Sequence, residues 1–180
     1  HLHHLGLSCQ QPCYQASTQD MEQVKQFLDE EFKQIQKVAQ ELKADIAFED
    51  ESWIQGNTRS GRTWGLVGHP PQIQVSDDRG GFHVLSMVTA AGELVFEVTT
   101  EKLVSAVFIR FLRKALCGRT RPLIVITDNA SYHTSNEVKD FVEAHSEQIR
   151  LFFFPPHSPK LNPDEQVWNC LLYTSPSPRD

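Results

Sequence analysis

Leu123-Ile124-Val125-Ile126-Thr127-Asp128-Asn129, at positions 123–129 of this 180-residue chain, decides the predicted fold class. The run up to Thr127 shows no alternation of apolar and polar side chains, which is typical of a strand buried on both faces. Such a strand belongs at the centre of a sheet that has parallel neighbours and helices on its faces. Because Asp128 follows the run directly, the sequence also predicts a carboxylate at the edge of that sheet.

The segments around this strand predict the rest of a mixed sheet. Strands are expected at 44–51, 82–89, 93–98 and 149–154. The second and third of these form a hairpin around Ala90-Ala91-Gly92. An antiparallel ribbon therefore precedes units in which strands alternate with helices, and this order indicates an α/β fold.

Three helices are predicted between and after these strands. One is capped by Thr100 and stops at Gly118, and one opens with a capping box of Thr134 and Glu137. The last helix starts at the cap Asn162. Helices placed between the strands in this way are expected to cover the faces of the sheet.

A long helix is predicted before the first strand, at 20–43. Apolar residues recur there at helical spacing, namely Met21, Val24, Phe27, Leu28, Phe32, Ile35, Val38 and Leu42. At about 3.6 residues per turn the segment makes about six turns. Its apolar stripe needs a partner to cover it.

The composition fits one folded domain, with 39% hydrophobic residues. The formal net charge of −6 argues against a surface that grips nucleic acid over its whole extent. Either nucleic acid is not the partner, or the basic part that grips DNA lies outside this chain. Four irregularly spaced cysteines, and no apolar run near the roughly 20 residues of a membrane span, favour a cytoplasmic location without a membrane.

Three carboxylates from distant segments are candidates for a shared metal site. Asp50 and Asp128 lie at the ends of predicted strands, and Glu165 lies in the first turn of the last predicted helix. Carboxylate oxygens suit Mg²⁺ or Mn²⁺, and two such ions about 3.5–4 Å apart need at least three carboxylates. Taken singly, each acid also has an ordinary explanation as a strand exit, an Asx turn or a helix-start residue.

Neighbouring acids compete for the same roles. Glu49 and Glu51 flank Asp50, and alternation along a strand turns them to the opposite face. Asp164 precedes Glu165 and points about 100° away from it around the helix. The choice among these acids stays open from the residues alone.

Four segments, in this order along the chain, resemble the DDE transposases of the mariner superfamily, in particular their bacterial insertion-sequence branch. They are Phe48-Glu49-Asp50-Glu51-Ser52, Gly61-Arg62-Thr63-Trp64 with Gly68, Thr127-Asp128-Asn129-Ala130-Ser131-Tyr132-His133, and the run from Pro155 to Trp168. The last segment is the most specific. In addition, 36 residues separate Asp128 from Glu165, a spacing within the range of such transposases.

The resemblance implies an RNase H-like catalytic domain, with a mixed five-stranded sheet, helices on both faces and a long helix before it. It selects Asp50, Asp128 and Glu165 as the catalytic residues and as the ligands of two Mg²⁺ or Mn²⁺ ions. In such enzymes the metals activate water to break a phosphodiester at a transposon end, and then activate the freed 3′-hydroxyl to attack target DNA.

The implied function is metal-dependent DNA hydrolysis and strand transfer in cut-and-paste transposition. The implied partner is double-stranded DNA, both transposon ends and target, and the implied active complex is a homodimer in the bacterial cytoplasm at the nucleoid. Two alternatives are an RNase H-like nuclease that stops after hydrolysis, and an inactive or domesticated fragment that only binds DNA or protein.

Five further residues are candidates for supporting roles. Asn129 and His133 are placed to assist the site by hydrogen bonding or phosphate contact, although a loop residue before a helix cap explains His133 equally well. Arg59, Arg62 and Arg79 lie in a glycine-rich stretch and are candidates for contacts with the DNA backbone. A solvated basic loop explains these arginines equally well.

The resemblance also divides the chain. We expect a remnant of a helix-turn-helix DNA-binding region at 1–19, a linker helix at 20–43 and the catalytic domain at 44–172. The last residues, 173–180, read as a foreign or disordered tail.

Overall fold

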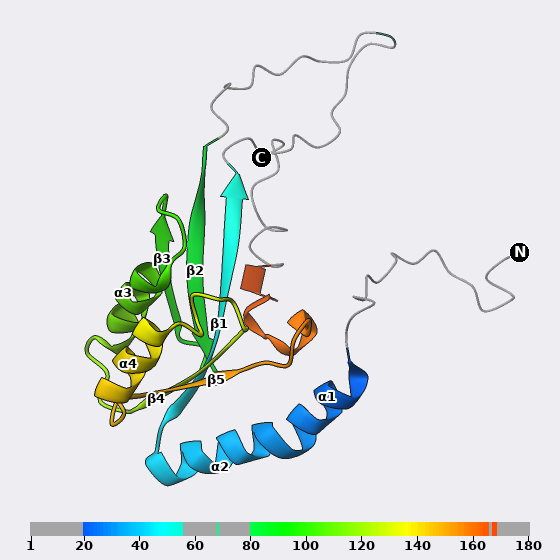
Figure 1. Ribbon diagram of the computed structural model, residues 1–180, viewed down its shortest axis with the longest axis vertical. Helices are drawn as coiled ribbons and strands as arrows, with labels where there is room; N and C mark the ends of the chain where they lie inside the picture. The colour runs from blue at the N-terminus through cyan, green and yellow to red at the C-terminus, as the bar shows by residue number, and fades with distance from the viewer. Residues whose placement is uncertain (1–19, 56–67, 69–79, 166, 169–180) are drawn as a thin grey trace, which may run out of the picture.

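The computed structural model describes residues 20–55, 68, 80–165 and 167–168, and these contain a five-stranded sheet (Figure 1). The strands lie in the order β3-β2-β1-β4-β5. β1, β2 and β3 pair antiparallel, whereas β1, β4 and β5 run parallel. Their bounds are β1 Asp45–Gln55, β2 Gly81–Thr89, β3 Leu94–Thr99, β4 Leu123–Thr127 and β5 Ile149–Phe153. The predicted mixed sheet with an antiparallel ribbon is confirmed.

Helices cover both faces of this sheet, as predicted (Figure 1). α3, Ser105–Leu116, and α4, Asn136–Ala144, lie on one face, where Phe108 packs in a core with Val125. The N-terminal helix lies on the other face and packs against Ile124. All five residues of β4 are buried, because this strand has a neighbour on each side and a helical layer on each face.

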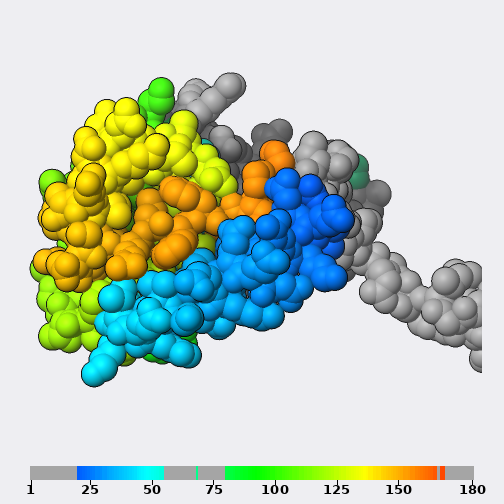
Figure 2. Space-filling model, turned by 60° about the horizontal axis from the view of Figure 1, so that its bottom comes forward, coloured from blue at the N-terminus to red at the C-terminus, as the bar shows by residue number. Residues whose placement is uncertain are grey.

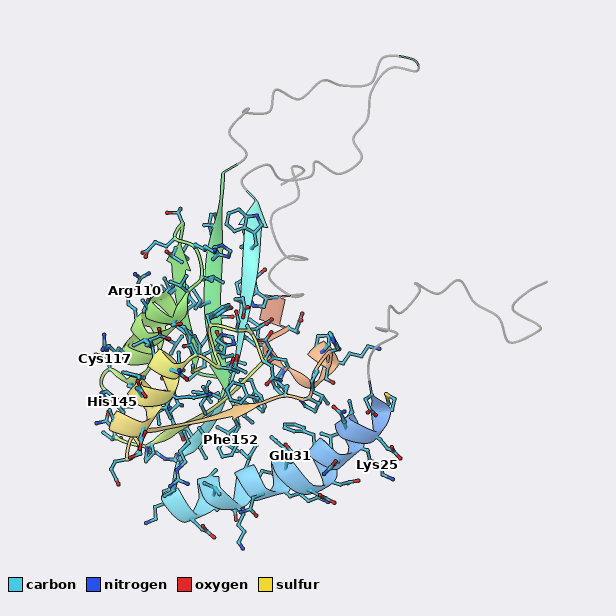
Figure 3. All side chains as sticks on the ribbon, viewed as in Figure 1. Lys25, Glu31, Arg110, Cys117, His145 and Phe152 are labelled. Carbon is cyan, nitrogen blue, oxygen red and sulfur yellow. The ribbon has the colours of Figure 1, made fainter. Side chains whose placement is uncertain are left out.

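The N-terminal helix is confirmed and consists of three consecutive segments. They are α1, Met21–Gln26, the π-helical segment η2, Phe27–Glu31, and α2, Phe32–Leu42. In Figure 2 this helix lies directly against β5 and the loop that follows it. Figure 3 shows the side chain of Phe152 between β5 and α2, in agreement with its packing in this apolar layer.

The predicted apolar stripe of this helix is wrong at three positions. Met21, Leu28 and Leu42 are exposed, by 60%, 45% and 37%. Leu28 lies in the π-helical turn, and an i→i+5 turn holds one more residue than an α-helical turn and rotates the face that meets the sheet, whereas Met21 and Leu42 are the first and last residues of the helix. Phe27 and Phe32, five positions apart, consequently both face inward, with ring centroids 6.2 Å apart.

The predicted caps of α3 and α4 are also wrong. At both helix starts the threonine hydroxyls form other local hydrogen bonds. Thr100 does not cap α3. The Thr99 hydroxyl accepts the N–H of Glu101 at 3.1 Å in a local turn, and the helix begins only at Ser105. The cap of α4 is Ser135, which accepts the N–H of Val138, whereas the Thr134 hydroxyl donates back to the carbonyl of Ala130.

β1 runs four residues beyond its predicted end, and this places the first candidate acid. Its pairing with β2 continues to Gln55, but its pairing with β4 stops at Phe48 and Ile126. Asp50 therefore lies inside β1 and not at its end, just beyond the level where β4 stops.

Within the described residues, no helix has the length and apolarity that crossing a membrane requires.

Candidate active site

The three predicted carboxylates lie around one pocket at the end of β4. Asp50, Asp128 and Glu165 all line this pocket, which has a volume of about 360 Å³. Asn129, Asn162 and the loop from Phe154 to Pro159 complete its wall. Residues that are far apart in the sequence are thus brought together as predicted.

Asn162 fixes the helical turn of Glu165 against β1. Its side-chain amide donates to the backbone carbonyl of Glu49 at 2.8 Å, and its side-chain oxygen accepts the N–H of Asp164 at 3.0 Å. The predicted cap is therefore confirmed. Since Glu49 directly precedes Asp50, this bond joins the helical turn that carries Glu165 to the residue next to Asp50.

Asp164 is turned away from the pocket. Its side chain is fully buried and accepts a hydrogen bond from the hydroxyl of Ser86, the residue paired with Asp50 across β1 and β2. Burial raises the pKa of Asp164 to about 6, and the Ser86 hydrogen bond opposes that rise. Of the two adjacent acids, Glu165 is the one that lines the pocket.

The pocket concentrates negative charge at Asp50. Burial, which is the largest cause, and the carboxylates of Glu165 and Glu51 together raise the pKa of Asp50 to about 8. A carboxylate in such a place either holds a proton or requires a cation. The donor set, three carboxylates in a small concave site, fits a hard divalent cation.

Asp128 is ionised and oriented by its own loop. Its pKa is lowered, first by a hydrogen bond from His133 and also by the N–H of Ala130, which is the predicted Asx turn. Both bonds go to the same oxygen, Oδ1, at 2.9 Å from His133 Nδ1 and 2.8 Å from the Ala130 nitrogen. The side chain is otherwise 61% exposed toward solvent.

Asn129 joins the ends of β4 and β5. Its amide donates to the backbone carbonyl of Phe154 at 2.6 Å. This bond anchors the start of the proline-rich loop that forms one wall of the pocket.

Glu49 and Glu51 lie on the opposite face of the sheet, as strand alternation predicts. The Thr127 hydroxyl donates to Glu49 at 2.5 Å, and the Tyr132 hydroxyl donates to Glu51. His133 is fully buried in the same group, and ligand atoms of Glu49, Glu51 and His133 lie within 4.8 Å of one another. Thr127 and Tyr132 were not predicted as partners of these acids. The signal available in the sequence was the strand alternation that turns Glu49 toward the core.

Several predictions concern parts of the chain outside the described residues. Arg59, Arg62 and Arg79 belong to this group, as do the lead-in at 1–19 and the tail at 173–180. Their assigned roles remain predictions.

A sheet in this order, with acids from β1, the end of β4 and a later helical turn around one pocket, defines an RNase H-like protein with an acidic site. The sequence model of the DDE superfamily endonucleases matches residues 45–175. The chain belongs to this family. None of the curated proteins matches its sequence.

Several solved structures of Mos1 transposase are similar to this chain. A pre-cleavage Mos1 transpososome matches with a TM-score of 0.67 and 17% identity, over 99% of this chain and 56% of the Mos1 chain. The Mos1 Strand Transfer Complex matches with a TM-score of 0.66 and 19% identity, over the same shares. The Mos1 mariner catalytic domain matches with a TM-score of 0.57 and 16% identity, over 89% of this chain and 74% of that domain.

These likenesses show a shared fold and confirm the predicted RNase H-like fold. This chain spans little more than half the length of the Mos1 chains that it matches in the DNA complexes.

Proposed function

We propose that this chain is the catalytic domain of a transposase that hydrolyses DNA phosphodiesters and then transfers the strand. The observation that carries the proposal is the convergence of Asp50, Asp128 and Glu165 on one pocket, in a chain that belongs to the DDE endonuclease family. Membership of the bacterial insertion-sequence branch and a place at the bacterial nucleoid stay predictions of the same proposal.

Asp50, Asp128 and Glu165 are the residues that would hold Mg²⁺ or Mn²⁺, as two ions. When bound, such ions polarise a phosphate and lower the pKa of a bound water. The protein contributes the rest. Asn162 holds Glu165 near Asp50, His133 and Ala130 orient Asp128, and the carbonyl of Phe154 fixes Asn129 in the wall of the pocket.

The proposed reaction has two balanced steps at the same pocket. In the first, a water oxygen bonds to phosphorus at a transposon end and the P–O3′ bond breaks, which leaves a 3′-hydroxyl and a 5′-phosphate. In the second, that 3′-hydroxyl oxygen bonds to a phosphorus of target DNA while the target's own P–O3′ bond breaks. No covalent protein intermediate is needed.

Double-stranded DNA is the proposed partner, and a homodimer is the proposed active complex. Support comes from the structural likeness to Mos1 complexes, one of which is described as a paired-end complex with the left transposon end. Related Mos1 complexes are described with Mn and with Mg. Arg59, Arg62 and Arg79 are the proposed contacts to the DNA backbone.

The test combines metal binding with two DNA reactions. Mn²⁺ affinity is measured by calorimetry, cleavage with duplexes that carry an uncut transposon end, and strand transfer with a pre-cleaved end. Asp128→Ala is expected to abolish all three. Asp140→Asn, which removes an exposed acid from α4, is the matched control and is expected to change none of them.

The outcomes separate the candidate functions. Cleavage without strand transfer would replace the proposal with a simple nuclease. Mn²⁺ binding that is unchanged in Asp128→Ala would refute the site itself.

A further inference from the structure

A buried polar network lies behind the pocket, on the opposite face of the sheet. Its members are Glu49 on β1, Thr127 at the end of β4 and His133 in the loop before α4, and each is 0% exposed. Charged and polar groups are costly to bury without partners. The network therefore calls for a physical reason.

His133 is the link between this network and the pocket. Its Nδ1 lies 2.9 Å from Asp128 Oδ1, and its Nε2 lies 3.6 Å from Glu49 Oε2. Because the ionised Asp128 carboxylate can only accept, Nδ1 of His133 must carry the proton. The imidazole thus has one nitrogen on the pocket acid and the other facing the buried acid.

The ring of His133 is held in place by aromatic packing. Its centroid lies 4.3 Å from that of Phe108 and 4.3 Å from that of Tyr132. Glu49 is held in turn by the Thr127 hydroxyl at 2.5 Å. The imidazole therefore cannot turn away from Asp128 without disturbing two elements of the core.

Two atoms of the network remain without hydrogen-bond partners among the described residues. They are Glu49 Oε1 and His133 Nε2, both buried. Such groups destabilise the folded state when they are left unsatisfied. An apolar pair would fill the same space at lower cost, so packing alone does not account for these side chains.

The effect of the network falls on one oxygen of Asp128. Oδ1 accepts from both His133 and Ala130, whereas Oδ2 accepts no hydrogen bond from the described residues. With Oδ1 held twice and the side chain largely exposed, Oδ2 is the oxygen left free for a ligand in the pocket.

We propose that Glu49 and His133 are positioning residues for Asp128, acting from the far face of the sheet so that Oδ2 alone is presented to the pocket. This inference rests on the proposed function. It adds a residue, Glu49, whose side chain never reaches the pocket, and it gives His133 a defined geometric role.

Two substitutions of His133 separate positioning from packing. In His133→Asn the amide nitrogen takes the place of Nδ1 and can still donate to Asp128. In His133→Gln the amide reaches the place of Nε2, so the contact with Glu49 is kept and the bond to Asp128 is lost. We expect His133→Gln to weaken Mn²⁺ binding by about 10–100-fold, the usual effect of losing a partner of a metal ligand. His133→Asn is expected to recover most of that affinity.

Glu49→Gln tests the far end of the network. It keeps the shape of the side chain and replaces the carboxyl group that faces Nε2 with an amide, so we expect an affinity loss near 10-fold. The Nδ1–H proton of His133, assigned by ¹⁵N NMR through its absence in His133→Gln, is expected to shift in Glu49→Gln. Val138→Ala, in the same core, controls for destabilisation and is expected to lower the unfolding midpoint without changing Mn²⁺ affinity.

Each outcome decides the inference. Equal Mn²⁺ affinity of wild type and His133→Gln, or equal losses in His133→Asn and His133→Gln, would refute positioning while leaving the proposed function intact. Metal binding abolished by Glu51→Gln and kept by Asp128→Asn would place the ion in the buried group and overturn the inference. A wild-type chain that binds no Mn²⁺ would remove the proposed function and the inference together.

Discussion

The two faces of β1 carry acids of the same kind in opposite environments. Asp50 faces a pocket with Asp128 and Glu165, whereas Glu49 faces the core with Thr127 and His133. One step along the strand separates them, and strand alternation alone assigns the sides. In this sheet the open face therefore gathers three acids around a pocket, and the closed face holds a buried acid that contacts the histidine bonded to one of them.

Both faces store electrostatic strain when no cation is present. The pKa of Asp50 and that of Glu49 are each raised to about 8, in both cases first by burial. In the proposed function the cation lies on the pocket side and relieves the strain there. Substitutions that neutralise each acid in turn should therefore have different consequences.

The largest effect is expected from a substitution in the pocket, at Asp50. Asp50→Asn should lower DNA cleavage more than about 100-fold, because it removes a proposed metal ligand and not merely a partner of one. In EDTA at pH 8 it should raise the unfolding midpoint, since the amide removes a buried charge that Glu165 repels. The expected gain is roughly 2–4 °C for each kcal/mol relieved. Asp140→Asn should change neither quantity, and a lower midpoint in Asp50→Asn would contradict the assigned repulsion.

The second prediction concerns the closed face and pH. The folded state prefers protonated Glu49, with a pKa raised from 4.5 to about 8. The free energy of unfolding should therefore decrease as pH rises from about 4.5 to 8, because ionisation is then easier in the unfolded chain. The raised pKa of His133 gives a slope of the same sign, since its contribution is lost as pH rises through the folded pKa.

Urea unfolding between pH 4.5 and 8.5, without divalent ions, measures this slope. The unfolding free energy of Glu49→Gln should depend less on pH than that of wild type. At the upper end of the pH range the two free energies should differ by several kcal/mol. Parallel profiles for the two proteins would show that Glu49 is ionised at little cost.

The third prediction concerns the connection between the two faces. Asn162→Ala removes the bond to the Glu49 carbonyl and the cap on Asp164. We expect a loss of about 1–2 kcal/mol in unfolding free energy, together with a lower cleavage rate, because Glu165 is no longer held near Asp50. Asn162→Ser keeps a capping oxygen and lacks the amide donor without adding a charge among these acids, so stability near that of Asn162→Ala would locate the effect in the bond to β1.

The sequence predicted those features that depend on local pattern. The unalternating run at 123–127 predicted β4, and strand alternation predicted that Asp50 and Glu49 face opposite sides. Features that depend on distant partners escaped prediction. Thr127 and Glu49 are 78 positions apart, and nothing local in either segment indicates that they share a buried hydrogen bond. The π-helical turn at 27–31 likewise depends on distant partners, because Phe27 and Phe32 both pack in the cluster on the sheet.

The smallest expected effect concerns the hydrogen bond between Ser86 and Asp164, next to Asp50. Ser86→Ala removes the hydroxyl that donates to buried Asp164, the acid excluded from the pocket. Because that hydrogen bond lowers the Asp164 pKa, its loss should raise the pKa above the present value of about 6. The stability cost should therefore be small at pH 5, where Asp164 is protonated in both proteins, and about 1 kcal/mol at pH 8, where the carboxylate has lost its donor. A double-mutant cycle with Asp164→Asn at both pH values measures this coupling, and a coupling equal at pH 5 and pH 8 would contradict the assignment of the hydroxyl to the ionised form.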